Sequence, residues 1–153
     1  MAYTDFSFYT ETYHGDVLTE GAADKWLDRA SDEVDSYTFY RLTEGLPTVE
    51  AHAARVKKAV CAVADALYCV EEQRKAVSAQ VQEDGTYRGA IASISSGKES
   101  VSYAVAGASG MSAYAAAAAS TQAFNALIGD IVTKYLKNIP DNNGVNLLYA
   151  GVL

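Results

Sequence analysis

The feature that most constrains this chain is a long apolar seam between residues 47 and 80. Its members are spaced alternately by four and three residues: Val49, Ala53, Val56, Val60, Val63, Leu67 and Val70. This spacing keeps the side chains on one face of a helix and is typical of helices packed lengthwise against others. We therefore expect a helix over 47–80 that forms the backbone of the core, with Thr48 as its N-cap.

A second helix is expected over residues 19–41, with Thr19 as its N-cap. Its apolar stripe consists of Trp26, Ala30, Val34 and Tyr37. A neighbouring stripe carries four carboxylates: Asp24, Asp28, Asp32 and Asp35. Two interpretations of the carboxylates stay open, a solvated helix face or a negative surface that faces a partner.

The remaining segments are less regular. Residues 85–108 are rich in glycine and serine around two β-prone runs, which predicts an extended arm or a β-hairpin. Residues 111–138, which include the alanine run 115–119, are expected to form one helix, followed by an extended apolar tail over 142–153. Residues 1–18 contain many aromatic side chains, and no helix or strand pattern runs through them. The sequence thus predicts a single domain that is mainly α, a small helical bundle with an arm and a tail.

The charge is uneven along the chain. The formal net charge is −7, and residues 1–50 hold eleven Asp and Glu against three Lys and Arg. A protein that grips a phosphate backbone needs a basic face, so this balance argues against a conventional nucleic-acid binder. Cys61 and Cys69 are eight residues apart in one expected helix and cannot bridge each other, which indicates buried thiols in a reducing compartment.

Chemistry-bearing motifs are absent from the sequence. His14 and His52 are isolated, and no nucleophile elbow, zinc-protease motif or dinucleotide-binding glycine set occurs. The segment "SSGKES" has the wrong spacing for a phosphate loop. No apolar run approaches the roughly 18 residues of a membrane span. We expect no enzyme activity, no cofactor, no metal and no membrane association.

Several segments, in order along the chain, resemble the head–tail connector (adaptor) proteins of long-tailed bacteriophages and prophages. The first is an aromatic "Y…FY…YHG" opening followed by "LDRASDEVDSYTFYRL". Seven residues of that segment fall on the family's "L..AS..ID..T..RI" pattern: Leu27, Ala30, Ser31, Val34, Asp35, Thr38 and Arg41. The segments "KKAVCAVADAL", "ISSGKESVSYA" and "YLKN…GVNLLYAGVL" follow. Leu42 stands where the family usually has Ile, and the alanine run is no family hallmark.

The resemblance implies a structural virion protein of the phage neck, assembled in the cytoplasm of a bacterial host. It would form a ring, a dodecamer by the same resemblance, that joins the portal protein to a downstream neck, stopper or tail protein. DNA would pass through the ring without sequence-specific binding. The alternative is a non-catalytic helical interaction module of a bacterial cytoplasm, monomeric or dimeric.

Site residues follow from this interpretation as three groups. The expected portal contacts are Leu147, Leu148, Tyr149, Val152 and Leu153. The expected contacts with an adjacent copy are Tyr9, Tyr13, Ile91, Ile94, Val101 and Tyr103. The aspartates at 24, 28, 32 and 35 are expected to face the channel, where negative walls repel the DNA backbone.

Overall fold

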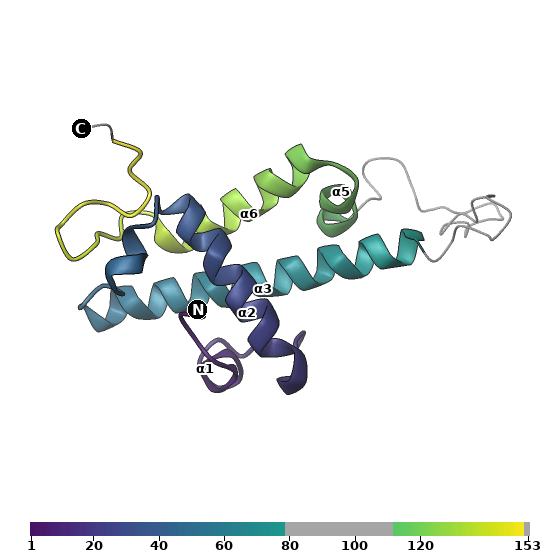
Figure 1. Cartoon of the computed structure of the whole chain (residues 1–153), viewed down its shortest axis with the longest axis horizontal. Helices are drawn as coiled ribbons and strands as arrows, with labels where there is room; N and C mark the ends of the chain where they lie inside the picture. The colour runs from purple at the N-terminus through teal and green to yellow at the C-terminus, as the bar shows by residue number, and fades with distance from the viewer. Residues whose placement is uncertain (79–111, 152–153) are drawn as a thin grey trace, which may run out of the picture. The chain divides into compact units, whose positions relative to one another are not determined.

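The computed structural model describes residues 1–78 and 112–151 (Figure 1). These residues form five α-helices and one 3-10 helix and contain no β-strand: α1 (Phe6–Glu11), α2 (Glu20–Tyr37), η1 (Arg41–Glu44), α3 (Glu50–Ser78), α5 (Ala113–Ala119) and α6 (Thr121–Leu136). The mainly α fold class is confirmed. The expected arm at 85–108 lies outside the described residues, as do Val152 and Leu153.

The chain divides into two compact units, whereas the sequence predicts a single domain. One unit comprises residues 1–68 and 128–153, and the other comprises residues 69–127. The boundaries fall inside α3 and α6, so each of these helices contributes residues to both units.

The apolar seam of α3 is confirmed as core from Val56 to Val70, whereas its first predicted member, Val49, precedes the helix and is 52% exposed. Val56, Val60 and Val63 are buried in the first unit, and the seam continues to buried Val70 in the second. The helix begins at Glu50, one residue later than the expected N-cap Thr48 would require. Thr48 instead donates its backbone N–H to Asn142 Oδ1 at 2.8 Å, and the carbonyl of Val49 accepts the first helical hydrogen bond from Ala53.

The helix α2 begins as predicted, with Thr19 at the N-cap in an extended conformation. Trp26, Leu27 and Val34 are among its buried residues. It ends at Tyr37 rather than at residue 41, because Phe39 and Tyr40 adopt left-handed backbone conformations with φ of 55° and 60°. A right-handed helix cannot continue through such residues.

Two helix predictions are wrong. The aromatic segment contains α1, which is too short to show periodicity and is started by Asp5, whose carboxylate accepts the N–H of Phe8 at 2.9 Å. The expected helix over 111–138 is broken at Ser120, whose backbone is extended at φ −144° and ψ 129°. Serine competes with helical hydrogen bonding, and here its hydroxyl accepts the N–H of Ala123, which starts α6.

The C-terminal segment, residues 137–151, folds back instead of extending throughout. Asp141 Oδ1 accepts the N–H groups of Asn143 and Val145 at 2.8 and 2.9 Å, which forms a tight turn. Beyond the turn, Leu147 donates its N–H to the carbonyl of Ile139 at 2.8 Å, and its side chain is buried. The expectation of a wholly extended tail is therefore wrong for residues 142–147.

Candidate protein-interaction surface

The aromatic N-terminal segment is tied to the helices of its own unit. Tyr3 donates its backbone N–H to Ser31 Oγ at 3.0 Å and its hydroxyl to Asp35 Oδ1 at 2.6 Å. Both partners lie on α2, one turn apart. The pKa of the Tyr3 hydroxyl is raised, first by burial and then by its hydrogen bond to Asp35. These contacts make Tyr3 a structural anchor.

Tyr9 is a second and deeper anchor. Its hydroxyl donates to Asp65 Oδ1 at 2.6 Å and accepts the N–H groups of Val17 and Leu18 at 2.9 and 3.0 Å. Burial is the main cause that raises the pKa of Tyr9 to about 12. Since its side chain has no exposed surface, the prediction that Tyr9 contacts an adjacent copy is wrong.

Asp65 accepts hydrogen bonds from two tyrosine hydroxyls of the N-terminal segment. Besides Tyr9, it accepts the hydroxyl of half-buried Tyr13 at 3.3 Å. Burial raises the pKa of Asp65 above its ordinary value, and the two tyrosine hydrogen bonds oppose that rise. Tyr13 keeps some exposed surface, so its expected role between copies stays a prediction. The other expected subunit contacts, Ile91, Ile94, Val101 and Tyr103, lie outside the described residues.

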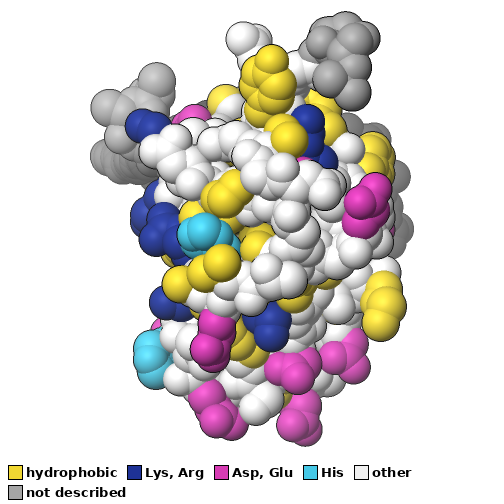
Figure 2. All heavy atoms as spheres, turned by 90° about the vertical axis from the view of Figure 1, so that its left-hand side faces the viewer, with side chains coloured by type: hydrophobic (Ala, Val, Ile, Leu, Met, Phe, Trp, Pro, Cys, Tyr) yellow, Lys and Arg dark blue, Asp and Glu magenta, His cyan; other side chains and the backbone are white. Residues whose placement is uncertain are grey.

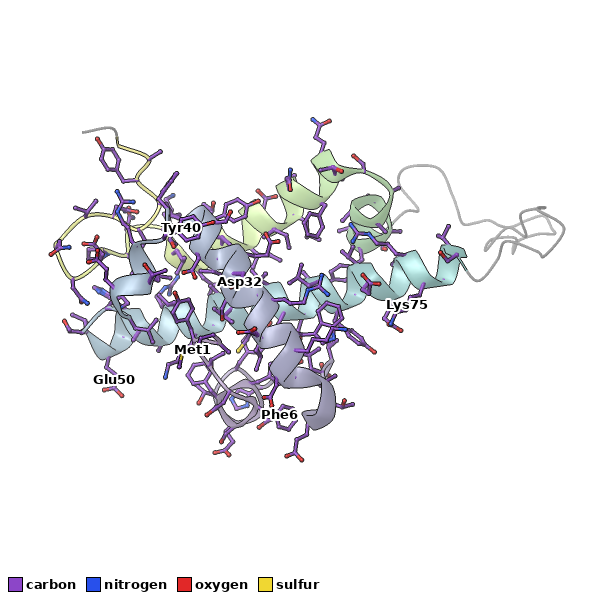
Figure 3. The ribbon with its side chains drawn as sticks, in the orientation of Figure 1. Met1, Phe6, Asp32, Tyr40, Glu50 and Lys75 are labelled. Atoms are coloured by element: carbon purple, nitrogen blue, oxygen red, sulfur yellow. The ribbon has the colours of Figure 1, made fainter. Side chains whose placement is uncertain are left out.

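The aspartate stripe lies on α2, and its members differ in exposure. Asp24, Asp28 and Asp32 are exposed, and Figure 3 labels Asp32 on α2. Asp35 is half-buried and accepts the hydroxyl of Tyr3. Burial, its largest cause, raises the pKa of Asp35. Three carboxylates are therefore available to a partner, and their orientation toward a channel stays a prediction.

The expected portal contacts also differ in their exposure. Leu147 is fully buried, so its prediction as a partner contact is wrong: the turn at Asp141 directs it into its own unit. Leu148 is half-buried and Tyr149 is exposed. The last two of the five, Val152 and Leu153, lie beyond the described residues.

Exposed aromatic side chains next to this tail form what we call the aromatic surface, made of Phe39, Tyr40 and Tyr149. Their side chains are 49%, 63% and 58% exposed. Arg41 holds the surface together, because its guanidinium lies 5.7 Å from the ring centre of Phe39 and donates to the carbonyl of Tyr149 at 2.9 Å. A longer 3.7 Å ion pair joins Arg41 to Asp141. Tyr40 lies just beyond the end of α2 (Figure 3).

The sequence analysis missed Phe39 and Tyr40 because it placed them inside a helix. Two adjacent residues other than glycine with positive φ are uncommon, and such backbone conformations cost free energy. The available signal was the position of "FY" off the apolar stripe of its helix. Figure 2 shows acidic side chains gathered mostly toward the bottom of the view, whereas hydrophobic side chains are scattered over the rest of this face.

The aromatic surface is suited to binding protein. Exposed aromatic rings bury a large area on association and lose little conformational entropy, which is why they are frequent in interface hot spots. In the described residues, no group of three or more His, Cys, Asp or Glu is arranged to hold a metal ion. Across the same two segments, no helix is long and apolar enough to cross a membrane.

Comparison with known proteins was made at three levels. The chain gives no match to a protein-family model, to a curated protein or to a solved structure.

Proposed function

We propose that this chain is a non-catalytic structural protein of a phage neck. Copies would form a ring that joins the portal protein to the downstream head-completion or tail protein and surrounds the passing DNA. The proposal draws on the ordered sequence resemblance to head–tail connectors. The observation that carries it is the aromatic surface, which is continuous with the C-terminal tail that the resemblance assigns to the portal.

The anchoring of the tail supports this role. Leu147 is inserted into its own unit, and Arg41 fixes the carbonyl of Tyr149 two residues later. These two contacts fix the backbone at Tyr149, next to the three exposed aromatic rings. A partner that meets such a preorganised surface loses less conformational entropy on binding than one that must first order a loose tail.

The test is binding to the portal protein encoded in the same genome. The complex of purified portal and wild-type chain is measured by native mass spectrometry and by electron microscopy. We expect a neck complex for the wild type and at least tenfold weaker binding for Tyr149→Ala combined with Tyr40→Ala. Tyr114→Ala, a partly exposed tyrosine of the other unit, is the matched control.

Two outcomes would reject the proposal. A wild-type chain that ignores the portal would favour the alternative, a helical interaction module of the host cytoplasm. Equal binding by the wild type and the double variant would remove the aromatic surface from the portal contact.

A further inference from the structure

A basic cluster lies on the first unit, where the early part of α3 meets the end of α6. Arg55 of α3 donates to the carbonyls of Tyr135 and Lys134 at 2.9 and 3.3 Å, which joins the two helices at this point. Lys58 lies three residues after Arg55 on α3, and Lys137 lies three residues after Lys134 at the end of α6. Residues at this spacing are neighbours on the surface of a helix. We define the basic cluster as Arg55, Lys58, Lys134 and Lys137. Figure 2 shows Lys and Arg side chains gathered along one edge of this face.

No ion pair joins the basic cluster to an acidic side chain in the part of the chain that the structure describes. In residues 1–78 and 112–151, ion pairs involve only Met1 with Asp28, Arg41 with Asp141 and Lys75 with Glu72. The negative end of the α6 dipole accounts for cations near the end of that helix. It does not account for Arg55 and Lys58, which lie in the second and third turns of α3, beyond the reach of either end of that helix dipole.

The exposed aspartates of α2 are the opposite case. Asp24, Asp28 and Asp32 are spaced by four residues, and like charges at this spacing destabilise a helix. Lys25 and Arg29 of the same helix each lie 4.9 Å from the ring centre of Trp26, and neither forms an ion pair with the three exposed aspartates in the described residues. Within the same residues, the amine of Met1 makes the one ion pair to them, at 2.9 Å from Asp28.

From these two surfaces we propose that the exposed aspartates of α2 in one copy dock on the basic cluster of the next copy. Charge complementarity favours this occupant, since the two surfaces have opposite signs and, within residues 1–78 and 112–151, the amine of Met1 on Asp28 is the only ion pair that either surface makes. The surfaces are different patches of one unit, so the contact is heterologous and closes into a ring where the rotation between copies allows it. The inference rests on the proposed function, and it assigns the aspartates to the contact between copies instead of to the channel wall.

Charge reversal tests the contact directly. One variant carries Asp28→Lys with Asp32→Lys, and the other carries Lys134→Glu with Lys137→Glu. We expect wild-type copies to associate at low salt and each variant alone to associate at least tenfold more weakly, because its two surfaces now repel. An equal mixture of the two variants should recover association, since each surface of one variant then meets its opposite on the other.

The matched control reverses the same amount of charge elsewhere, with Glu44→Lys and Glu72→Lys, and should associate like the wild type. Association is measured by sedimentation and native mass spectrometry, up to about 1 mM chain, where even contacts of millimolar dissociation constant are populated. The same samples are measured on the purified portal, where occupancy by the single variants should fall and occupancy by their mixture should recover. Recovery by the mixture in either setting supports the inference.

A carbodiimide that condenses carboxylates with amines identifies the contact. In a mixture of isotopically light and heavy wild-type chains, we expect cross-links between copies to join the aspartates to Lys134 or Lys137. The inference is overturned if the mixture of variants recovers nothing with or without the portal, or if no such cross-link joins two copies. If the inference is overturned but the single variants still bind the portal, the proposed function stands. If the wild type binds no portal, the proposed function is rejected, but any measured contact between copies remains valid.

Discussion

The two ends of the first unit are both rich in apolar residues, yet they are held in different ways. Residues 1–18 are attached by side chains, because tyrosine hydroxyls donate to carboxylates on α2 and α3. Residues 137–151 are attached by the buried side chain of Leu147, by Asn142, whose amide bonds the backbone of Leu46 and Thr48, and by the carbonyl of Tyr149, which accepts from Arg41. The first segment buries its central aromatic residue, whereas the second leaves one exposed.

The contrast between Tyr9 and Tyr149 shows what separates a structural tyrosine from one available to a partner. Both are tyrosines in segments that look equally unfinished in the sequence. Tyr9 meets a half-buried carboxylate and two backbone N–H groups, so its hydroxyl can be buried without losing hydrogen bonds. No hydrogen bond of the Tyr149 hydroxyl is found within residues 1–78 and 112–151, and its ring is exposed. A tyrosine whose hydroxyl has hydrogen-bond partners inside the fold is structural, whereas an exposed tyrosine without them is available to another protein.

The largest effect is expected from Tyr9→Ala. The substitution removes a buried ring and leaves Asp65 and two N–H groups without their partner, so the free energy of unfolding should fall by about 3–5 kcal/mol. Urea unfolding followed by circular dichroism measures it. A loss below about 1 kcal/mol would mean that the N-terminal segment is not part of the cooperative unit.

Sequence reasoning found those elements whose signals are local and repeated. The seam from Val56 to Val70 could be predicted because each member repeats the same spacing. Helix α1 could not, because six residues are fewer than two turns, and its carboxylate cap resembles any other exposed aspartate.

The candidate surface was harder to predict because it depends on contacts between distant residues. Arg41 meets Tyr149 across 108 positions, and Tyr9 meets Asp65 across 56. The spacing of neighbouring residues carries no information about such pairs. Tyr149 was expected at the portal contact and is exposed, so that role stays a prediction. Tyr9 and Leu147 were also expected at interfaces, because apolar terminal segments look alike whether or not their own fold covers them.

The second-largest effect is expected from Leu147→Ala, which tests the C-terminal attachment. Truncating a fully buried leucine should lower the free energy of unfolding by about 2–5 kcal/mol. Leu148→Ala, at the half-buried neighbour, is the matched control and should cost less than half as much, since less apolar area is lost. Equal losses at the two positions would contradict the observed burial.

A smaller effect, in pH dependence, is expected at Asp65. Burial raises the pKa of this carboxyl above its ordinary 3.8, so the folded chain holds a proton that the unfolded chain releases. The stabilisation from that proton is complete below the ordinary value and is lost as the pH rises through the folded pKa. Asp65→Asn removes the titration. The variant should therefore gain stability relative to the wild type as the pH rises from about 3 to 7.

Urea unfolding across this range measures the difference between Asp65→Asn and the wild type at each pH. The shift of Asp35 has the same sign, but it is present in both proteins and cancels in the difference. A difference that stays flat with pH, or that changes in favour of the wild type as the pH rises, would contradict the burial of Asp65.

The smallest effect on stability is expected from Tyr149→Ala, and this completes the contrast with Tyr9. The ring is exposed and the contact to Arg41 uses the backbone carbonyl, which alanine retains. The free energy of unfolding should change by no more than about 0.5 kcal/mol. If the aromatic surface binds the portal, the same substitution weakens that binding, so stability and binding separate at Tyr149. In Tyr9→Ala, stability and portal binding should both decrease, because the loss of Tyr9 destabilises the first unit, which carries the aromatic surface. A Tyr149→Ala chain that unfolds as readily as Tyr9→Ala would show that its ring is structural and would remove it from the interface.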